Sequence, residues 1–110
     1  MGVKRARRFD VLLVDMSGAQ GREIQKTRPC LVVSPDEMNR HLSFVLVAPL
    51  TTARRAYPTR VDCRFQERDG QIALDQVRSI DLKRVRARLG RVTEDEGRAA
   101  LDVLRRMFAA

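Results

Sequence analysis

Polar side chains that could act on a phosphate gather at the ends of two apolar runs in the first half of the chain. Glu23, Lys26 and Arg28 precede the run "CLVVS", and Thr51 and Thr52 follow the run "FVLVAPL". A guanidinium at the start of a strand can hold a phosphate by two hydrogen bonds and stabilise the added negative charge of a pentacoordinate phosphorane. Threonine hydroxyls can donate hydrogen bonds to the same phosphate. These residue types suit chemistry on a phosphodiester.

Two ordinary explanations compete with this interpretation. Arg28 could form a structural ion pair with Glu23, and threonines often end a strand as part of a turn. The combination becomes informative if the two strands are antiparallel neighbours, because the start of one strand then meets the end of the next. In that case we expect Arg28 and Thr51 to lie at one end of the sheet.

The sequence lacks the motifs of several other catalytic mechanisms. His41 is the single histidine, so two imidazoles cannot share acid and base roles. The chain has no GxxxxGK[ST] phosphate loop, no nucleophile elbow, no HExxH motif and no acids spaced for a two-metal site. We therefore expect no metal and no cofactor. Cys30 and Cys63 stand far apart, each inside a predicted strand, and are predicted to be buried thiols.

The overall charge favours a polyanionic partner. Lysine and arginine number 22 against 14 acidic residues, which gives a net charge of +8 over 110 residues. A general arginine bias of the source proteome would produce a similar balance. The length fits one domain, residues 1–110. No apolar stretch is long enough to cross a bilayer, and Asp10 and Asp15 interrupt the run that would have to serve as a signal peptide. We expect a cytoplasmic protein.

Hydrophobic patterning predicts a mostly β fold with one C-terminal helix. Ser34 is expected to cap a short helical turn. The segment "QERDG" (residues 66–70) is expected to hold a hairpin turn, because Asp69-Gly70 favours the positive backbone angles that such a turn needs. Thr93 begins a capping box that should start the terminal helix. Loops are expected at residues 17–26 and 53–58. The predicted strands lie within residues 9–16, 28–34, 44–50, 59–65, 71–81 (one or two strands) and 85–92.

With these residues assembled, the sequence resembles the MazF/PemK family of toxin endoribonucleases (mRNA interferases) from type II toxin-antitoxin systems. The segments that carry the resemblance occur in order along nearly the whole chain: "DVLLVD", "GREIQKTRPCLVVSPDEMNR", "VAPLTT", "YPTRV" and "ERDGQIALDQVRSID". The resemblance implies a compact SH3-like β-barrel of the MazF/CcdB type and a homodimer. It also implies metal-independent cleavage of single-stranded RNA at short sequences through attack of a 2'-hydroxyl. A cognate MazE-like antitoxin, with an acidic segment that fills the RNA groove, would neutralise the toxin.

The resemblance assigns the catalytic arginine to Arg28 and the catalytic threonine to Thr51. Arg28 is a poor candidate for the general base, because arginine almost never loses its proton in a protein. Glu23 is the preferred candidate and Asp75 is the second. Alternatively, Arg28 acts as an electrostatic clamp and as proton donor to the leaving oxygen, while water takes the first proton.

Substrate contacts follow from the same comparison. Tyr57 could stack on a base and the arginines of residues 53–58 could follow the phosphates. The expected substrate-binding residues are Lys26, Thr52, Arg54, Arg55, Tyr57, Asp75, Gln76 and Arg78.

Two departures from the family pattern stand out. Phe9 replaces a usual glycine, and Arg22 replaces a small residue beside Glu23. Packing is expected to absorb Phe9, whereas Arg22 could alter cleavage specificity or weaken Glu23 as a base. Two other functions remain open: a non-enzymatic CcdB-like toxin that binds gyrase, and an inactive relative that binds RNA. The intact K-x-R-P and P-L-T-T segments favour the nuclease.

Overall fold

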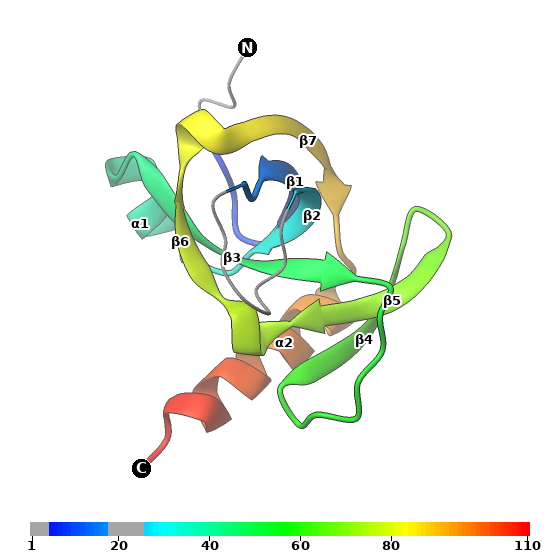
Figure 1. Ribbon diagram of the computed structural model, residues 1–110. Coiled ribbons are helices and arrows are strands. Elements are labelled where there is room, and N and C mark those ends of the chain that lie inside the picture. The colour runs from blue at the N-terminus through cyan, green and yellow to red at the C-terminus, as the bar shows by residue number, and fades with distance from the viewer. Residues whose placement is uncertain (1–4, 18–25) are drawn as a thin grey trace.

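The computed structural model describes residues 5–17 and 26–110, and it consists mainly of antiparallel strands with a long helix at the C-terminus (Figure 1). This arrangement confirms the predicted class. The strands are β1 (Asp10–Asp15), β2 (Thr27–Val32), β3 (Phe44–Thr51), β4 (Arg60–Phe65), β5 (Arg68–Ala73), β6 (Arg78–Asp81) and β7 (Val85–Arg91). The helices are α1 (Asp36–His41) and α2 (Glu94–Phe108), with 3-10 turns at Leu74–Gln76 and Leu82–Arg84.

The strands form one curved sheet with the order β4-β5-β3-β2-β1-β7, and every pairing is antiparallel. The long strand β3 changes partners along its length: its first half pairs with β6 and its last two residues pair with β5. Figure 1 shows β6 along the left side of the molecule, between the turn that follows β5 and the start of β7. This change of partner bends the sheet around a core.

The expected closure into a barrel is not seen, because the hydrogen-bonded path among the described residues ends at β4 and β7. The free edge of β4 is instead covered by α2, where the Glu96 carboxylate accepts a hydrogen bond from the Arg64 backbone N–H at 2.9 Å. One contact links the two ends of the sheet: the side-chain amide of Gln66, in the turn after β4, donates to the Leu89 carbonyl of β7 at 3.4 Å. An edge strand that is covered in this way does not need a further strand partner.

Two clusters of buried side chains lie on the two faces of the sheet. One cluster packs beneath α2 and includes Phe9, Leu31, Ile72 and Val103. The other lies between β1, β2, β3, β6 and β7 and includes Cys30. Both cysteines are buried and unpaired, as predicted. Burial raises the pKa of the Cys30 thiol to about 12 and that of the Cys63 thiol to about 11.

The terminal helix starts as the sequence predicts. Thr93 accepts a hydrogen bond from the Glu96 backbone N–H, and the Glu96 carboxylate accepts one from the Thr93 N–H, which completes the capping box. Gly97 in the first turns of α2 faces the ring of Phe9, which is buried. Phe9 has a backbone φ of 77°, in the region that glycine favours, so its packing offsets a strained backbone.

The prediction for Ser34 was wrong. Ser34 does not cap α1: its hydroxyl donates to the Asn39 side chain and accepts from the Leu46 N–H, so it joins α1 to β3. The β4-β5 turn lies within the predicted residues 66–70, but at Gln66 and Glu67, which have φ values of 52° and 64°. Asp69-Gly70, which was expected to form the turn, lies inside β5. Among the described residues, no helix combines the length and the apolar character needed to cross a membrane.

Candidate active site

The register between β2 and β3 brings Arg28 and Thr51 together. Cys30 pairs with Pro49, so a step of two residues along each antiparallel strand places Arg28 opposite Thr51. Both residues, together with Thr52, line a cavity of about 470 Å³ at this end of the sheet, which we call the Arg28 cavity. The two strands are therefore antiparallel neighbours, and the expected meeting of Arg28 with Thr51 is observed.

Gly70 holds the end of β3 in place beside this cavity. A Cβ atom at position 70 would lie 2.5 Å from the carbonyl oxygen of Thr51, so only glycine allows β5 to approach so closely. Thr51 Oγ1 accepts a hydrogen bond from the Ala53 N–H at 3.1 Å. Because that contact uses the oxygen as acceptor, the hydroxyl hydrogen can be donated to a phosphate in the cavity.

The walls of the Arg28 cavity combine cationic and apolar groups. Arg28 and Arg68 supply positive charge, and Asp69 is paired with Arg64 at 2.9 Å. A phosphodiester could therefore meet two guanidiniums and a hydroxyl donor in a partly apolar setting, where charge stabilisation is stronger than in open water. The remaining wall residues are Leu13, Pro29, Leu50, Cys63, Phe65, Gln66 and Leu89.

A second cavity of about 320 Å³ adjoins the first, and Thr51 lines both. We call it the Tyr57 cavity. It contains four of the residues predicted to bind substrate: Arg55, Tyr57, Asp75 and Gln76. Its walls also include Ala53 and Arg60, and Arg60 was absent from the sequence prediction. The two cavities meet at the end of β3.

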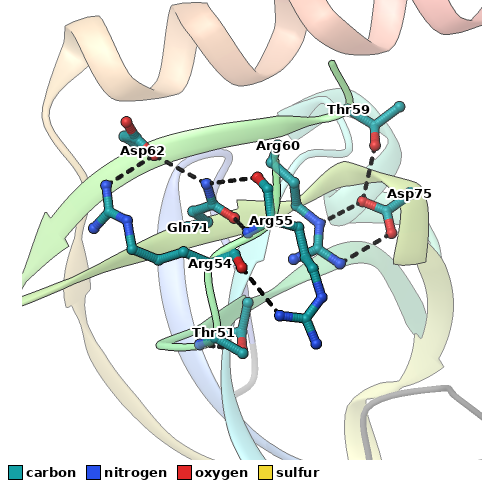
Figure 2. Close-up of polar contacts among 9 residues, drawn as sticks. Thr51, Arg54, Arg55, Thr59, Arg60, Asp62, Gln71 and Asp75 are labelled. Carbon is teal, nitrogen blue, oxygen red and sulfur yellow. Dashed lines mark hydrogen bonds and ion pairs between the residues drawn. The ribbon is translucent and has the colours of Figure 1, made fainter. Parts of the chain in front are cut away.

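Asp75 is tightly held at one side of the Tyr57 cavity (Figure 2). Its Oδ1 accepts from the Thr59 hydroxyl at 3.0 Å and from Arg60 Nε at 2.7 Å, and its Oδ2 accepts from Arg60 Nη2 at 3.2 Å. Burial tends to raise the pKa of Asp75, but the hydrogen bonds from Arg60, the backbone and Thr59 outweigh burial and hold it below its usual value. A carboxylate with a lowered pKa is a weak proton acceptor.

Gln71 fixes the loop between β3 and β4 (Figure 2). Its side-chain oxygen accepts from the Arg55 N–H at 2.9 Å, and its amide donates to the Arg55 carbonyl and to Asp62. Arg54 pairs with Asp62 at 3.3 Å. The loop is therefore ordered by the sheet below it, although Arg54 lines neither cavity as the structure describes them.

The remaining predicted residues lie apart from the two cavities or cannot be placed. Lys26 is exposed, and its carbonyl accepts from the Met16 N–H at 2.8 Å. Arg78 lies on β6, opposite Val47 of β3, and lines an apolar groove beside α2. Glu23 and Arg22 lie outside the described residues.

Sequence reasoning missed Arg60 because its position looked like the outward side of an alternating strand. Its side chain is in fact only 7% exposed and pairs with Asp75. The local sequence contains one signal for a special role of Arg60: it is a basic residue that begins a strand directly after Pro58 and Thr59. Within residues 5–17 and 26–110, no group of three histidine, cysteine, aspartate or glutamate side chains is placed to bind a metal ion.

Known proteins resemble this chain in sequence and in fold. Residues 7–108 match a family described as a PemK-like, MazF-like toxin of type II toxin-antitoxin systems. The endoribonuclease MazF of Staphylococcus epidermidis is 32% identical over 96 residues, which cover 82% of this chain and 80% of the relative. The endoribonuclease toxin MazF of Escherichia coli K12 is 39% identical over 71 residues, which cover 64% of each chain.

Solved structures show the same fold. A mycobacterial endoribonuclease in complex with its cognate antitoxin superposes with a TM-score of 0.78 at 25% identity and covers 92% of both chains. MazF from Deinococcus radiodurans gives a TM-score of 0.83 at 22% identity, over 94% of this chain and 96% of that one. The match in sequence extends over nearly the full length, and the arginine and threonine of the two shared segments meet in one cavity. The chain belongs to the PemK/MazF family of toxins from type II toxin-antitoxin systems.

Proposed function

We propose that this protein is a metal-independent, sequence-specific endoribonuclease toxin that cleaves single-stranded RNA. The observation that carries the proposal is the Arg28 cavity, where Arg28 and Thr51 line the same wall at the end of the β2-β3 pair. Cleavage of messenger RNA would inhibit translation and growth. The chain acts as a single toxin domain, residues 1–110, in the cytoplasm.

In the proposed reaction, Arg28 and Thr51 act on the phosphate, and a separate group accepts the proton of the attacking hydroxyl. The 2'-hydroxyl oxygen attacks the adjacent phosphorus and the bond from phosphorus to the 5'-oxygen breaks, which leaves a 2',3'-cyclic phosphate and a 5'-hydroxyl. Arg28 binds the non-bridging oxygens and stabilises the charge that they gain in the pentacoordinate state. Thr51 donates its hydroxyl to the same phosphate, and Thr52 lies beside it in the cavity wall.

The attacking 2'-hydroxyl must lose a proton, and the 5'-oxygen must gain one. Glu23 remains the preferred base. The lowered pKa of Asp75 and its hydrogen bonds to Arg60 argue against Asp75 in that role. If water takes the first proton, Arg28 serves as the clamp and as the donor to the leaving oxygen.

The substrate path extends from the Arg28 cavity into the Tyr57 cavity. Arg55 can neutralise a flanking phosphate there, while Lys26, Arg54 and Arg78, which line neither cavity, are proposed to contact phosphates farther along the RNA. A cognate MazE-like antitoxin binds over this basic path through an acidic segment, and the toxin functions as a homodimer. The antitoxin found with the mycobacterial relative supports this partnership.

Cleavage of a long single-stranded RNA in excess EDTA tests the proposal. The wild type should cut only at one short sequence motif. Primer extension maps the fragment ends, and these ends should fall at the same position within every occurrence of the motif in the RNA. Arg28→Ala should reduce the rate by about 100-fold or more, the usual loss when one transition-state donor is removed. Arg98→Ala, an exposed arginine on α2 outside both cavities, is the matched control. RNA binding without cleavage by the wild type would refute the enzyme and direct attention to a gyrase-binding or RNA-binding role.

The identity of the base is tested by the pH dependence of the rate. If Glu23 is the base, Glu23→Gln removes the acidic limb of the pH-rate profile, whereas Asp75→Asn keeps it. An acidic limb that persists in both variants would show that neither carboxylate is the base.

A further inference from the structure

The Tyr57 cavity holds a buried arginine that the cleavage chemistry does not use. Arg60 is 7% exposed, and a guanidinium in such a place must be paired. Its Nε and Nη2 both donate to Asp75, so the planar group is held at two points. The same guanidinium lies 5.2 Å from the centroid of the Tyr57 ring, within the range of a cation-π contact. Arg60 therefore fixes both a carboxylate and an aromatic ring.

Building on the proposed function, we propose that the Tyr57 cavity is a subsite for one nucleobase, in which Arg60 positions Tyr57 and Asp75 so that the base stacks on the ring and donates an amino hydrogen to the carboxylate. The volume of about 320 Å³ is at the lower end of the range for small-ligand sites. Tyr57 is 48% exposed, so its ring is accessible for stacking.

Oδ2 of Asp75 is less occupied by side chains than Oδ1. Oδ1 accepts two side-chain hydrogen bonds, from Thr59 and Arg60, whereas Oδ2 accepts one, from Arg60. Because a carboxylate oxygen can accept two hydrogen bonds, Oδ2 is the atom that accepts a hydrogen from the substrate. Asp75 lines the cavity and its side chain is 29% exposed, so the substrate can reach it.

The chemistry of this acceptor selects a class of base. Cytosine, adenine and guanine each carry an exocyclic amino group that can donate to a carboxylate. Uracil carries its one ring N–H between two carbonyl oxygens, which the carboxylate repels. The subsite therefore favours a base with an amino group and disfavours uracil. Arg60 also neutralises Asp75, so the carboxylate does not repel the neighbouring phosphates.

A purely structural role for the pair is the main competing explanation. The Arg60-Asp75 bridge joins β4 to the 3-10 turn at Leu74–Gln76, and it would stabilise that junction without any RNA. A structural role predicts a change in unfolding temperature only. The subsite predicts a change in the bases found beside the cut.

The experiment compares cleavage motifs on a single-stranded RNA pool with randomised sequence. Sequencing of the 5'-hydroxyl ends gives base frequencies around each cut for the wild type, Asp75→Asn, Arg60→Lys and Tyr57→Leu. At one position of the motif, the wild type should exclude uracil. Asp75→Asn should reduce that discrimination about tenfold, the size expected for one hydrogen bond to a charged group. Arg60→Lys and Tyr57→Leu should loosen the same position.

Asp102→Asn is the matched control, because it removes the carboxylate of another arginine pair, the 2.6 Å contact with Arg106 on α2, outside both cavities. It should leave the motif unchanged. Thermal unfolding of each variant identifies any that fails to fold, and Tyr57→Leu changes a side chain that is 48% exposed. An unchanged motif in the folded variants would overturn the subsite and leave the nuclease intact.

The proposed nuclease function is tested separately. It fails if the wild type does not cleave RNA, or if it cleaves no faster than Arg28→Ala. In that case, the affinities of the wild type and Asp75→Asn are compared for two oligonucleotide pools, one lacking uracil and one rich in uracil. A preference of the wild type for the first pool that Asp75→Asn loses would support the subsite. Equal preferences in both proteins would overturn it.

Discussion

Gly97→Ala should destabilise the protein, although the same change stabilises most helices. Gly97 is buried in α2, and a Cβ atom there would lie 2.7 Å from three carbon atoms of the Phe9 ring. The ring cannot easily retreat. It is 8% exposed, and the backbone of Phe9 is held by a bond from its N–H to the Val32 carbonyl at 2.9 Å and by one from the Val92 N–H to its carbonyl at 3.2 Å.

The sign of the effect follows from two opposing magnitudes. Alanine gains about 1 kcal/mol of helix propensity over glycine. Overpacking a tight core costs about 1 to 3 kcal/mol. The expected net loss is about 1 kcal/mol, which lowers the melting temperature of a domain of this size by roughly 4 to 8 °C. Urea and thermal unfolding followed by circular dichroism measure it, with the exposed Arg98→Ala as the control.

A second variant tests whether the contact with the Phe9 ring is the reason that Gly97→Ala lowers stability. Phe9→Leu removes ring atoms and should cost stability by itself, but it opens the space that a methyl group at position 97 needs. In that background, Gly97→Ala should become neutral or stabilising. If Gly97→Ala raises the melting temperature of the wild type, or costs the same in both backgrounds, then Phe9 does not limit this helix.

Three further predictions concern capping and titration. Thr93→Ala removes the acceptor of the 3.1 Å bond from the Glu96 N–H and should cost about 1 kcal/mol in urea unfolding, whereas Thr93→Ser should cost little. Burial raises the pKa of Cys30 to about 12 and that of Cys63 to about 11, so both native thiols should resist thiolate-specific reagents at about pH 8 and react on unfolding. Their folded pKa values lie above the unfolded ones, so this contribution to stability is complete below the unfolded pKa and is lost as pH rises toward the folded values. The lowered pKa of Asp75 affects stability in the opposite direction. Its contribution to stability is present above the unfolded pKa near 3.8 and is lost as pH falls through the folded pKa. The difference in melting temperature between the wild type and Asp75→Asn across that pH range measures this contribution.

Local signals predicted those elements that depend mainly on their own residues. The capping box at Thr93 and the apolar face that follows it located α2, and the apolar runs located the strands. The errors fell where distant residues decide the outcome. Ser34 bonds to β3 instead of capping a helix, and positive φ values fell on Gln66 and Glu67 although Asp69-Gly70 is better suited to them. Gly70 was needed elsewhere, beside the carbonyl of Thr51.

The residues of the candidate site also differ in how well the sequence predicts them. Arg28 and Thr51 could be predicted as a pair because antiparallel register follows from neighbouring strands. The burial of Arg60 could not be predicted, since it depends on Asp75, fifteen residues later, meeting it from a turn outside the strands. An ion pair between a strand and a turn leaves no periodic pattern in the sequence.

The position of Thr51 between the two cavities suggests that chemistry and base selection can be altered separately. A change at Arg28 removes charge stabilisation from every scissile phosphate, so it should lower the rate at all sequences by a similar factor. A change at Tyr57, Arg60 or Asp75 acts on one base beside the cut, so it should change which sequences are cut while Arg28 still acts on the phosphate. Thr51 lines both cavities, and its replacement by valine should therefore lower the rate and disturb the motif together. A Thr51→Val protein that is slower but keeps the wild-type motif would show that the two cavities bind their parts of the RNA independently.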